Sequence, residues 1–194
     1  MKQNKVQRNG VLLLVLTIIL FVCACTPQKP SEVVLPKSLL NYSQTDAETM
    51  LETYRADKTI CQDAYVRDED LVLVVTQEQF ESLWQENEQM MQSFRDGLAE
   101  EEGYWLEESG DYTAFKFYCD ENVPMILNLK ILQGMSGCYG IAQVLKGNMD
   151  WSVEVTVVNC HTNKVVASFV CPGVGGYDAE DWAESYKVDE TADG

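Results

Sequence analysis

The sequence predicts an α+β domain in which helices cover a sheet, a two-layer sandwich. Three stretches predict it. Residues 71–75 form a valine-rich apolar run, typical of a buried strand. Residues 151–160 alternate apolar and polar side chains, the pattern of a strand with one buried face. Residues 124–146 are apolar around almost the whole circumference of a predicted helix, which indicates burial on more than one side.

The strand at 71–75 leads directly into a helix. Thr76 and Gln79 have the spacing of a capping box, and Val75 and Phe80 stand at the positions of a hydrophobic staple. A helical stripe follows and is interrupted at Asn87; it consists of Phe80, Leu83, Trp84, Met91, Phe94 and Leu98. Before this unit, a capping box at residues 45–48 predicts a short helix that presents Met50, Leu51 and Tyr54 on one face.

Two further strands are predicted at residues 104–107 and 112–119, joined by a hairpin turn. Phe115 and Phe117 mark the core side of the second strand. The two-residue period of a strand places Cys119 on that same side.

The apolar helix is expected to begin with Asn122 or Val123 as its cap and Pro124 in its first turn. A membrane span is the alternative for this segment, but its polar residues would make a span costly; they are Asn128, Lys130, Gln133 and Gln143. Three interior glycines each disfavour a helix, so either another element approaches closely or the helix breaks; they are Gly134, Gly137 and Gly140.

A two-layer sandwich cannot cover such a helix with the sheet alone. The remaining apolar surface is expected to be covered by the chain itself, through the helix near Met50 and Tyr54 or through the segment 182–186. The alternative cover is a protein partner or a second copy of the chain, with the glycines permitting close approach.

The strand within residues 151–160 is expected to form a hairpin with residues 165–171, with Asn163 at a left-handed turn position. Tyr177, Trp182 and Tyr186 can dock a last short helix, and residues 188–194 form an acidic tail. The resulting order of elements resembles the βαββαβ order of ferredoxin-like sandwiches, with one extra C-terminal hairpin strand. That resemblance implies that the strands starting at Leu71 and Tyr112 are central neighbours.

The N-terminal segment has the layout of an export signal. Three basic residues precede an apolar run at residues 11–21, which is too short to span a membrane comfortably. The following Val22-Cys23-Ala24-Cys25 resembles the lipobox of bacterial lipoproteins, although Cys23 stands where a small or aliphatic residue is usual. The resemblance implies cleavage before Cys25 and acylation of its thiol, with the protein held on the extracytoplasmic face of the cell membrane. The alternatives are a plain secretory signal and an uncleaved anchor.

The expected organisation is therefore a signal peptide at 1–24, a lipid-anchored tether at 25–40, one α+β domain at 41–187 and a tail at 188–194. The formal charge of the whole chain is −17. Removal of the signal leaves 11 basic against 31 acidic residues, a net charge near −20. A charge of this sign argues against nucleic acid and against a surface that lies flat on anionic lipid.

The cysteines give little sign of chemistry. Five remain after the signal and the acylated residue, and they contain no CxxC pair; they are Cys61, Cys119, Cys138, Cys160 and Cys171. We expect buried, reduced thiols, with at most two disulfides as the alternative. No cofactor or metal is predicted, because one histidine and scattered cysteines lack zinc spacing and the acidic runs at 68–70 and 178–181 lack the pattern of a calcium loop.

One catalytic alternative comes from a family resemblance. Residues 133–139, Gln-Gly-Met-Ser-Gly-Cys-Tyr, faintly resemble the Gln…Gly-x-Cys-aromatic loop of papain-like cysteine peptidases. That resemblance implies Cys138 as nucleophile, Gln133 at the oxyanion hole, and His161 and Asn159 completing the set. The spacing from Gln133 to Cys138 is one residue short, and His161 follows too soon in the chain.

These observations predict a membrane-anchored lipoprotein that is not an enzyme. Its expected role is a binding or interaction module for another envelope protein or an extracellular ligand. The alternative is a thiol-dependent hydrolase that uses Cys138 and His161.

Overall fold

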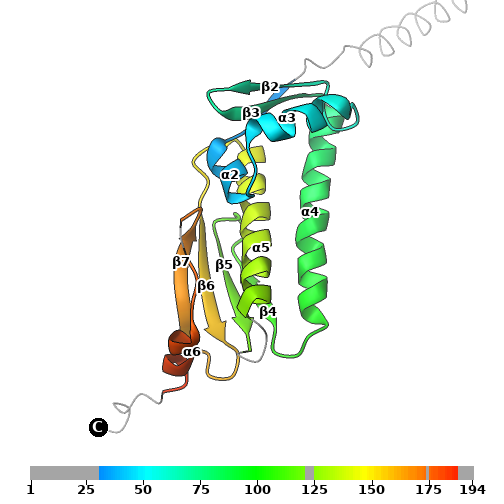
Figure 1. Ribbon diagram of the computed structural model, residues 1–194. Coiled ribbons are helices and arrows are strands. Elements are labelled where there is room, and N and C mark those ends of the chain that lie inside the picture. Colours follow the sequence, from blue (N-terminus) through cyan, green and yellow to red (C-terminus); the bar gives the residue numbers. More distant parts are fainter. Residues whose placement is uncertain (1–30, 121–124, 174, 188–194) are drawn as a thin grey trace, which may run out of the picture. The chain divides into compact units, whose positions relative to one another are not determined.

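The computed structural model describes residues 31–120, 125–173 and 175–187 (Figure 1). Helices and strands are interspersed along the chain, and the strands form two separate sheets, with strand orders β1-β3-β2 and β4-β5-β6-β7. The α+β class is confirmed. The predicted signal peptide, the first residues of the predicted tether and the predicted cap at Asn122 to Pro124 lie outside the described residues, as does the acidic tail.

The first sheet is antiparallel and has β3 (Asp70–Val75) at its centre. On one side lies β2 (Asp63–Arg67), which turns into β3 through Asp68 and Glu69, both with positive φ. On the other side lies β1 (Ser31–Leu35), where Ser31 pairs with Val75 and Leu35 with Leu71.

The tether expected at residues 25–40 is therefore wrong from Ser31 onward. β1 and the short helix α2 (Lys37–Tyr42) occupy this stretch, and Val33, Leu39 and Leu40 are buried. The prolines of this stretch favour a tether in the sequence, but they flank the strand and do not interrupt it. Pro36 is the N-cap residue of α2, a position that tolerates the missing N–H. The folded domain begins at Ser31 and not at residue 41.

The second sheet consists of β4 (Trp105–Glu108), β5 (Ala114–Cys119), β6 (Val153–Asn159) and β7 (Val165–Cys171). β5 and β6 are parallel, and the outer pairs are antiparallel. The predicted neighbourhood of the strands starting at Leu71 and Tyr112 is wrong, because they lie in different sheets. β3 already pairs with β1 on one edge and β2 on the other, so it has no free edge for β5. The prediction did not include β1, so it left that edge of β3 open.

The helix α5 (Met125–Leu145) is continuous and lies between the second sheet and α4 (Gln77–Ala99) (Figure 1). From Leu132 to Leu145, no residue of α5 is exposed. The chain itself covers the helix, as expected, but the main cover is α4, assisted by α2 and β1. Among the described residues, no helix meets the length and apolarity that a membrane crossing requires.

Local capping residues mark where the remaining helices begin. The capping box of Thr76 and Gln79 is present at the start of α4. In α3 (Ala47–Ala56) the cap is Asp46, one residue after the predicted Thr45, and its carboxylate accepts from Thr49 N. The last helix, α6 (Ala179–Ser185), buries Trp182 as expected.

Candidate functional site

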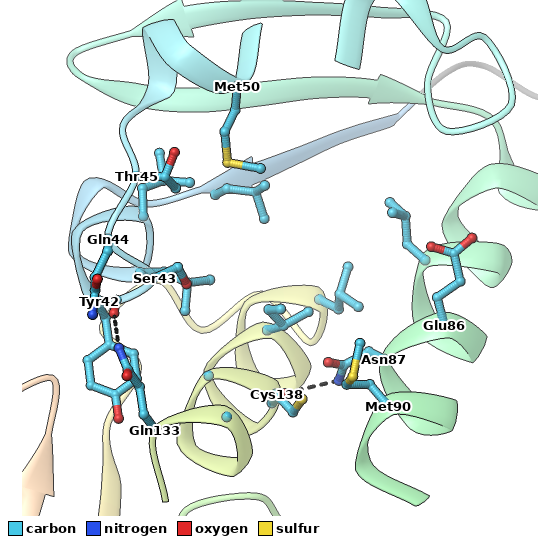
Figure 2. A pocket seen from close by; sticks show the side chains of 18 of the residues that line it. Tyr42, Ser43, Gln44, Thr45, Met50, Glu86, Asn87, Met90, Gln133 and Cys138 are labelled. Carbon is cyan, nitrogen blue, oxygen red and sulfur yellow. Dashed lines mark hydrogen bonds between the residues drawn. The ribbon is translucent and has the colours of Figure 1, made fainter. Parts of the chain in front are cut away.

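A cavity of the described domain lies where α2, α3, α4 and α5 meet the first sheet. Its volume is about 780 Å³, within the range of pockets that hold small organic ligands. Figure 2 shows Met50 reaching in from α3, with Cys138 of α5 and Met90 of α4 on the far side.

The wall of the cavity is mainly apolar. Each helix around it contributes apolar side chains, as do the strands β1 and β3; the aliphatic members are Val33, Leu35, Leu39, Leu40, Leu73, Leu83, Ile141 and Leu145. Aliphatic side chains cannot hydrogen-bond a polar ligand, so the burial of polar groups against them would cost hydration without compensation. The wall therefore suits an apolar molecule.

Polar side chains also line the cavity, among them Asn87 of α4 and Gln133 of α5, and a consecutive set lies in the connection between α2 and α3. Ser43, Gln44 and Thr45 are consecutive residues that line the cavity there (Figure 2). Gln44 has a φ of 58°, a left-handed turn position that closes this connection. Among the described residues that line the cavity, the charged ones are Glu86 and Lys130.

The glycines of α5 shape the space. A Cβ at Gly134 would come within 2.3 Å of the Phe94 ring, and one at Gly140 within 2.7 Å of Trp151 and 2.9 Å of Leu39. Close approach at these two positions is confirmed. Gly137 differs, because a Cβ there would meet no atom within 4 Å, and this residue lines the cavity.

Asn87, where the apolar stripe of α4 is interrupted, connects the two long helices. Its side chain is 6% exposed, and Nδ2 donates to the backbone oxygen of Cys138 at 3.0 Å (Figure 2). Cys138 is itself buried, and this burial raises the pKa of its thiol to about 11. The thiol is therefore protonated at neutral pH and is a poor nucleophile.

The structure does not bring the predicted catalytic residues together. Gln143, five residues after Cys138, donates to the backbone oxygens of Tyr112 and Ser152, just before β5 and β6 begin. His161 follows the opposite end of β6, and a strand of that length spans about 20 Å. Cys138 faces the helical cavity, whereas His161 Nε2 lies 2.8 Å from Asp120 Oδ2.

The other two members of the papain-like set have structural partners. Gln133 Nε2 donates to the backbone oxygen of Tyr42 at 3.1 Å, which ties α5 to α2. Asn159 is fully buried and donates to Ser185 Oγ at 2.9 Å. The geometry gives the hydrolase alternative no support.

The five cysteines of the described residues are free thiols, and all except the half-buried Cys160 are buried. Cys119 lies on the core face of β5 beside Phe117, as predicted. Cys25, the predicted acylation site, lies outside the described residues.

Sequence reasoning missed the cavity as a site. Its residues come from six elements that are spread along the chain, and Leu39 lies in a segment expected to be a tether. The local sequence signal for the cavity was Gly137, a glycine inside a predicted helix. The structure shows that no other element approaches it closely. The chain matches no family model, and no curated protein or solved structure is significantly similar to it.

Proposed function

We propose that this protein is a lipid-anchored extracytoplasmic lipoprotein whose domain binds an apolar small molecule in the helical cavity. The observation that carries the proposal is the cavity itself, about 780 Å³ with a largely apolar wall. The consecutive polar residues 43–45 at one side suit a molecule with an aliphatic body and one polar end. The role is binding and not catalysis.

Few residues separate the proposed lipid anchor at Cys25 from the folded domain. β1 begins at Ser31, so an acyl group on Cys25 would leave only residues 25–30 between the lipid and the first strand. Six extended residues reach at most about 20 Å. The domain would then stay close to the membrane surface, where aliphatic amphiphiles are concentrated.

The charge of the chain restricts the ligand further. The net charge near −20 of the chain without its signal repels anions at long range, and few charged groups line the cavity. An uncharged or cationic amphiphile fits these conditions better than a free fatty acid. Nucleic acid remains an unsuitable ligand for the same reason.

A matched pair of glycine variants tests the proposal. In Gly137→Leu the new side chain enters the cavity, whereas in Gly97→Leu it enters solvent on α4; neither Cβ meets an atom within 4 Å. Both replacements favour the helix, so a loss of binding would not reflect unfolding. The ligand probe is Nile red, an uncharged apolar dye, added to a soluble form that starts at Thr26.

We expect the wild type and Gly97→Leu to bind the dye with the same Kd, and Gly137→Leu to bind at least about tenfold more weakly, since a leucine occupies ligand volume. Equal affinity in all three proteins would contradict the proposal. Mass spectrometry of an organic extract from the membrane-anchored protein would then identify the natural ligand, which should be depleted in Gly137→Leu.

A further inference from the structure

A second cluster of reactive side chains lies at the other end of the domain, where β5 and β6 end together. These strands are parallel, with Cys119 opposite Asn159, and Cys160 N continues the pairing by donating to Cys119 O at 3.1 Å. The residues that follow the two strands therefore leave the sheet at one edge. Asp120 follows β5, and Cys160 and His161 follow β6.

One ligand atom from each of Asp120, Cys160 and His161 lies within 4.8 Å of the other two. Within the cluster, His161 Nε2 and Asp120 Oδ2 lie 2.8 Å apart. Around a tetrahedral zinc ion with bonds of about 2.0–2.3 Å, ligand atoms lie about 3.5 Å apart. Small side-chain rotations would bring the three atoms to that spacing.

The turn that carries two of these residues is held in place by buried hydrogen bonds. Asn159 Oδ1 accepts from His161 N at 2.9 Å, and Asn159 Nδ2 donates to Ser185 Oγ. Ser185 is 2% exposed, and its hydroxyl donates to Trp182 O at 2.7 Å. The turn is thus fastened to α6, which packs at this end of the second sheet in Figure 1. Such support keeps ligands in position before an ion arrives.

The absence of a side chain at Gly103 leaves room for the thiol of Cys160. A Cβ at Gly103 would lie 3.2 Å from Cys160 Sγ, and the φ of 86° at this residue also favours glycine. The sulfur therefore rests against the turn between α4 and β4 and is half-buried. The His161 side chain is 52% exposed and that of Asp120 21%, so an ion can enter from solvent.

We propose that Asp120, Cys160 and His161 bind a divalent transition-metal ion of the zinc class. Thiolate, imidazole and carboxylate are the three ligand types that zinc takes in proteins, and this cluster supplies one of each. A hard ion such as Mg²⁺ would not select the sulfur. An exposed His–Asp ion pair accounts for the 2.8 Å contact but gives no reason for the thiol beside it.

Three protein ligands leave a fourth position for water or for another molecule, as in zinc sites that remain open. The acidic surface raises the local concentration of cations. The site is independent of the helical cavity, so either proposal can fail without the other.

The test is Zn²⁺ titration of the full chain in detergent with its thiols reduced, followed by Co²⁺ as a spectroscopic probe. We expect one saturable Zn²⁺ site in the wild type. His161→Gln and Cys160→Ser should each weaken it by at least about tenfold, because each removes a ligand. The Co²⁺ complex should show a thiolate charge-transfer band that is lost in Cys160→Ser.

Two variants serve as controls. Asp150→Asn removes an exposed carboxylate elsewhere, and Cys61→Ser removes a thiol from the region of the first sheet; both should bind like the wild type. His161 is exposed enough that its replacement should leave the circular dichroism spectrum unchanged. The proposal is overturned if the wild type shows no saturable site, or if either ligand variant binds Zn²⁺ as tightly as the wild type.

Discussion

The ring of Phe94 in α4 lies against the backbone of Gly134 in α5, so closely that a Cβ at position 134 would come within 2.3 Å of the ring. One turn further along α5, the space beside Gly137 is empty to beyond 4 Å. Two glycines in the same helix therefore have opposite roles. Gly134 allows the two long helices to meet, and Gly137 keeps a cavity open between them.

These roles predict opposite effects of the same substitution. Gly137→Ala should raise the free energy of unfolding by about 0.5–1 kcal/mol, the gain of alanine over glycine in a helix. Gly134→Ala should lower it by about 1–3 kcal/mol, because the Phe94 ring must move. Urea denaturation measures both. In a Phe94→Ala background the penalty at Gly134 should vanish, and a penalty that persists would show that the ring is not its cause.

The thiols should differ in reactivity according to their burial. Burial raises the pKa of Cys119 to about 12 and that of Cys138 to about 11, so both lack the thiolate that reacts. With a bulky maleimide and a metal chelator present, we expect Cys160 to be labelled first in the folded protein. Cys119 should be labelled only in denaturant. Mass spectrometry locates the label, and native labelling of Cys119 ahead of Cys160 would contradict its position on the core face.

Local sequence patterns predicted the elements whose signals lie within a few residues. The capping box at Thr76, the apolar positions of β6 and the left-handed turn at Asn163 all depend on near neighbours, and the structure has each of them. The assembly of these elements depends on partners far along the chain. The composition of β1, which is flanked by prolines, does not predict a strand. Its strand conformation depends on pairing with β3, in which Ser31 lies opposite Val75.

The sites were harder to predict for the same reason. The neighbours of Cys138 in the chain suggest a nucleophile, yet its buried, protonated thiol lines a largely apolar cavity. His161 was assigned to that thiol, but parallel pairing of β5 and β6 places it beside Asp120. Cys160 and His161 are adjacent in the chain, whereas Asp120 lies 41 positions from His161 and is brought beside it by the strand topology.

Acylation at Cys25 remains a prediction from the lipobox resemblance. Radiolabelled palmitate should enter the wild type and the Cys23→Ser variant equally, because Cys23 would be removed with the signal peptide. Cys25→Ser should take up no label and should be released from the membrane. Label retained in Cys25→Ser would show that the acylation site is elsewhere.

Acid should weaken the hairpin between β4 and β5 through Asp111. Hydrogen bonds from Thr113 and Ser109 lower the pKa of this carboxyl from 3.8 to about 2. Because the folded pKa lies below the ordinary value, the ionised carboxylate stabilises the fold above pH 4, and this contribution is lost as the pH falls from about 4 to about 2.

In Asp111→Asn, denaturant unfolding should therefore show a flatter pH dependence across that window. Thr113→Val, which removes the hydroxyl that donates to Asp111 at 2.7 Å, should flatten it in the same direction. An unchanged slope in both variants would exclude this carboxyl as a source of the acid sensitivity.

The segment 177–187 should be required for stability, since it covers one end of the main core. Tyr177 and Trp182 are 6% and 8% exposed, their rings meet edge to face at 6.0 Å, and they belong to the same core cluster as Leu132 of α5. Deletion of residues 177–194 removes both rings, each worth about 3–5 kcal/mol when a buried aromatic is lost. We expect a lower melting temperature and binding of a hydrophobic dye. Deletion of residues 188–194 alone, the predicted acidic tail, is the matched control and should leave the melting curve unchanged. If the longer deletion also melts like the wild type and binds no dye, this segment does not cover the core.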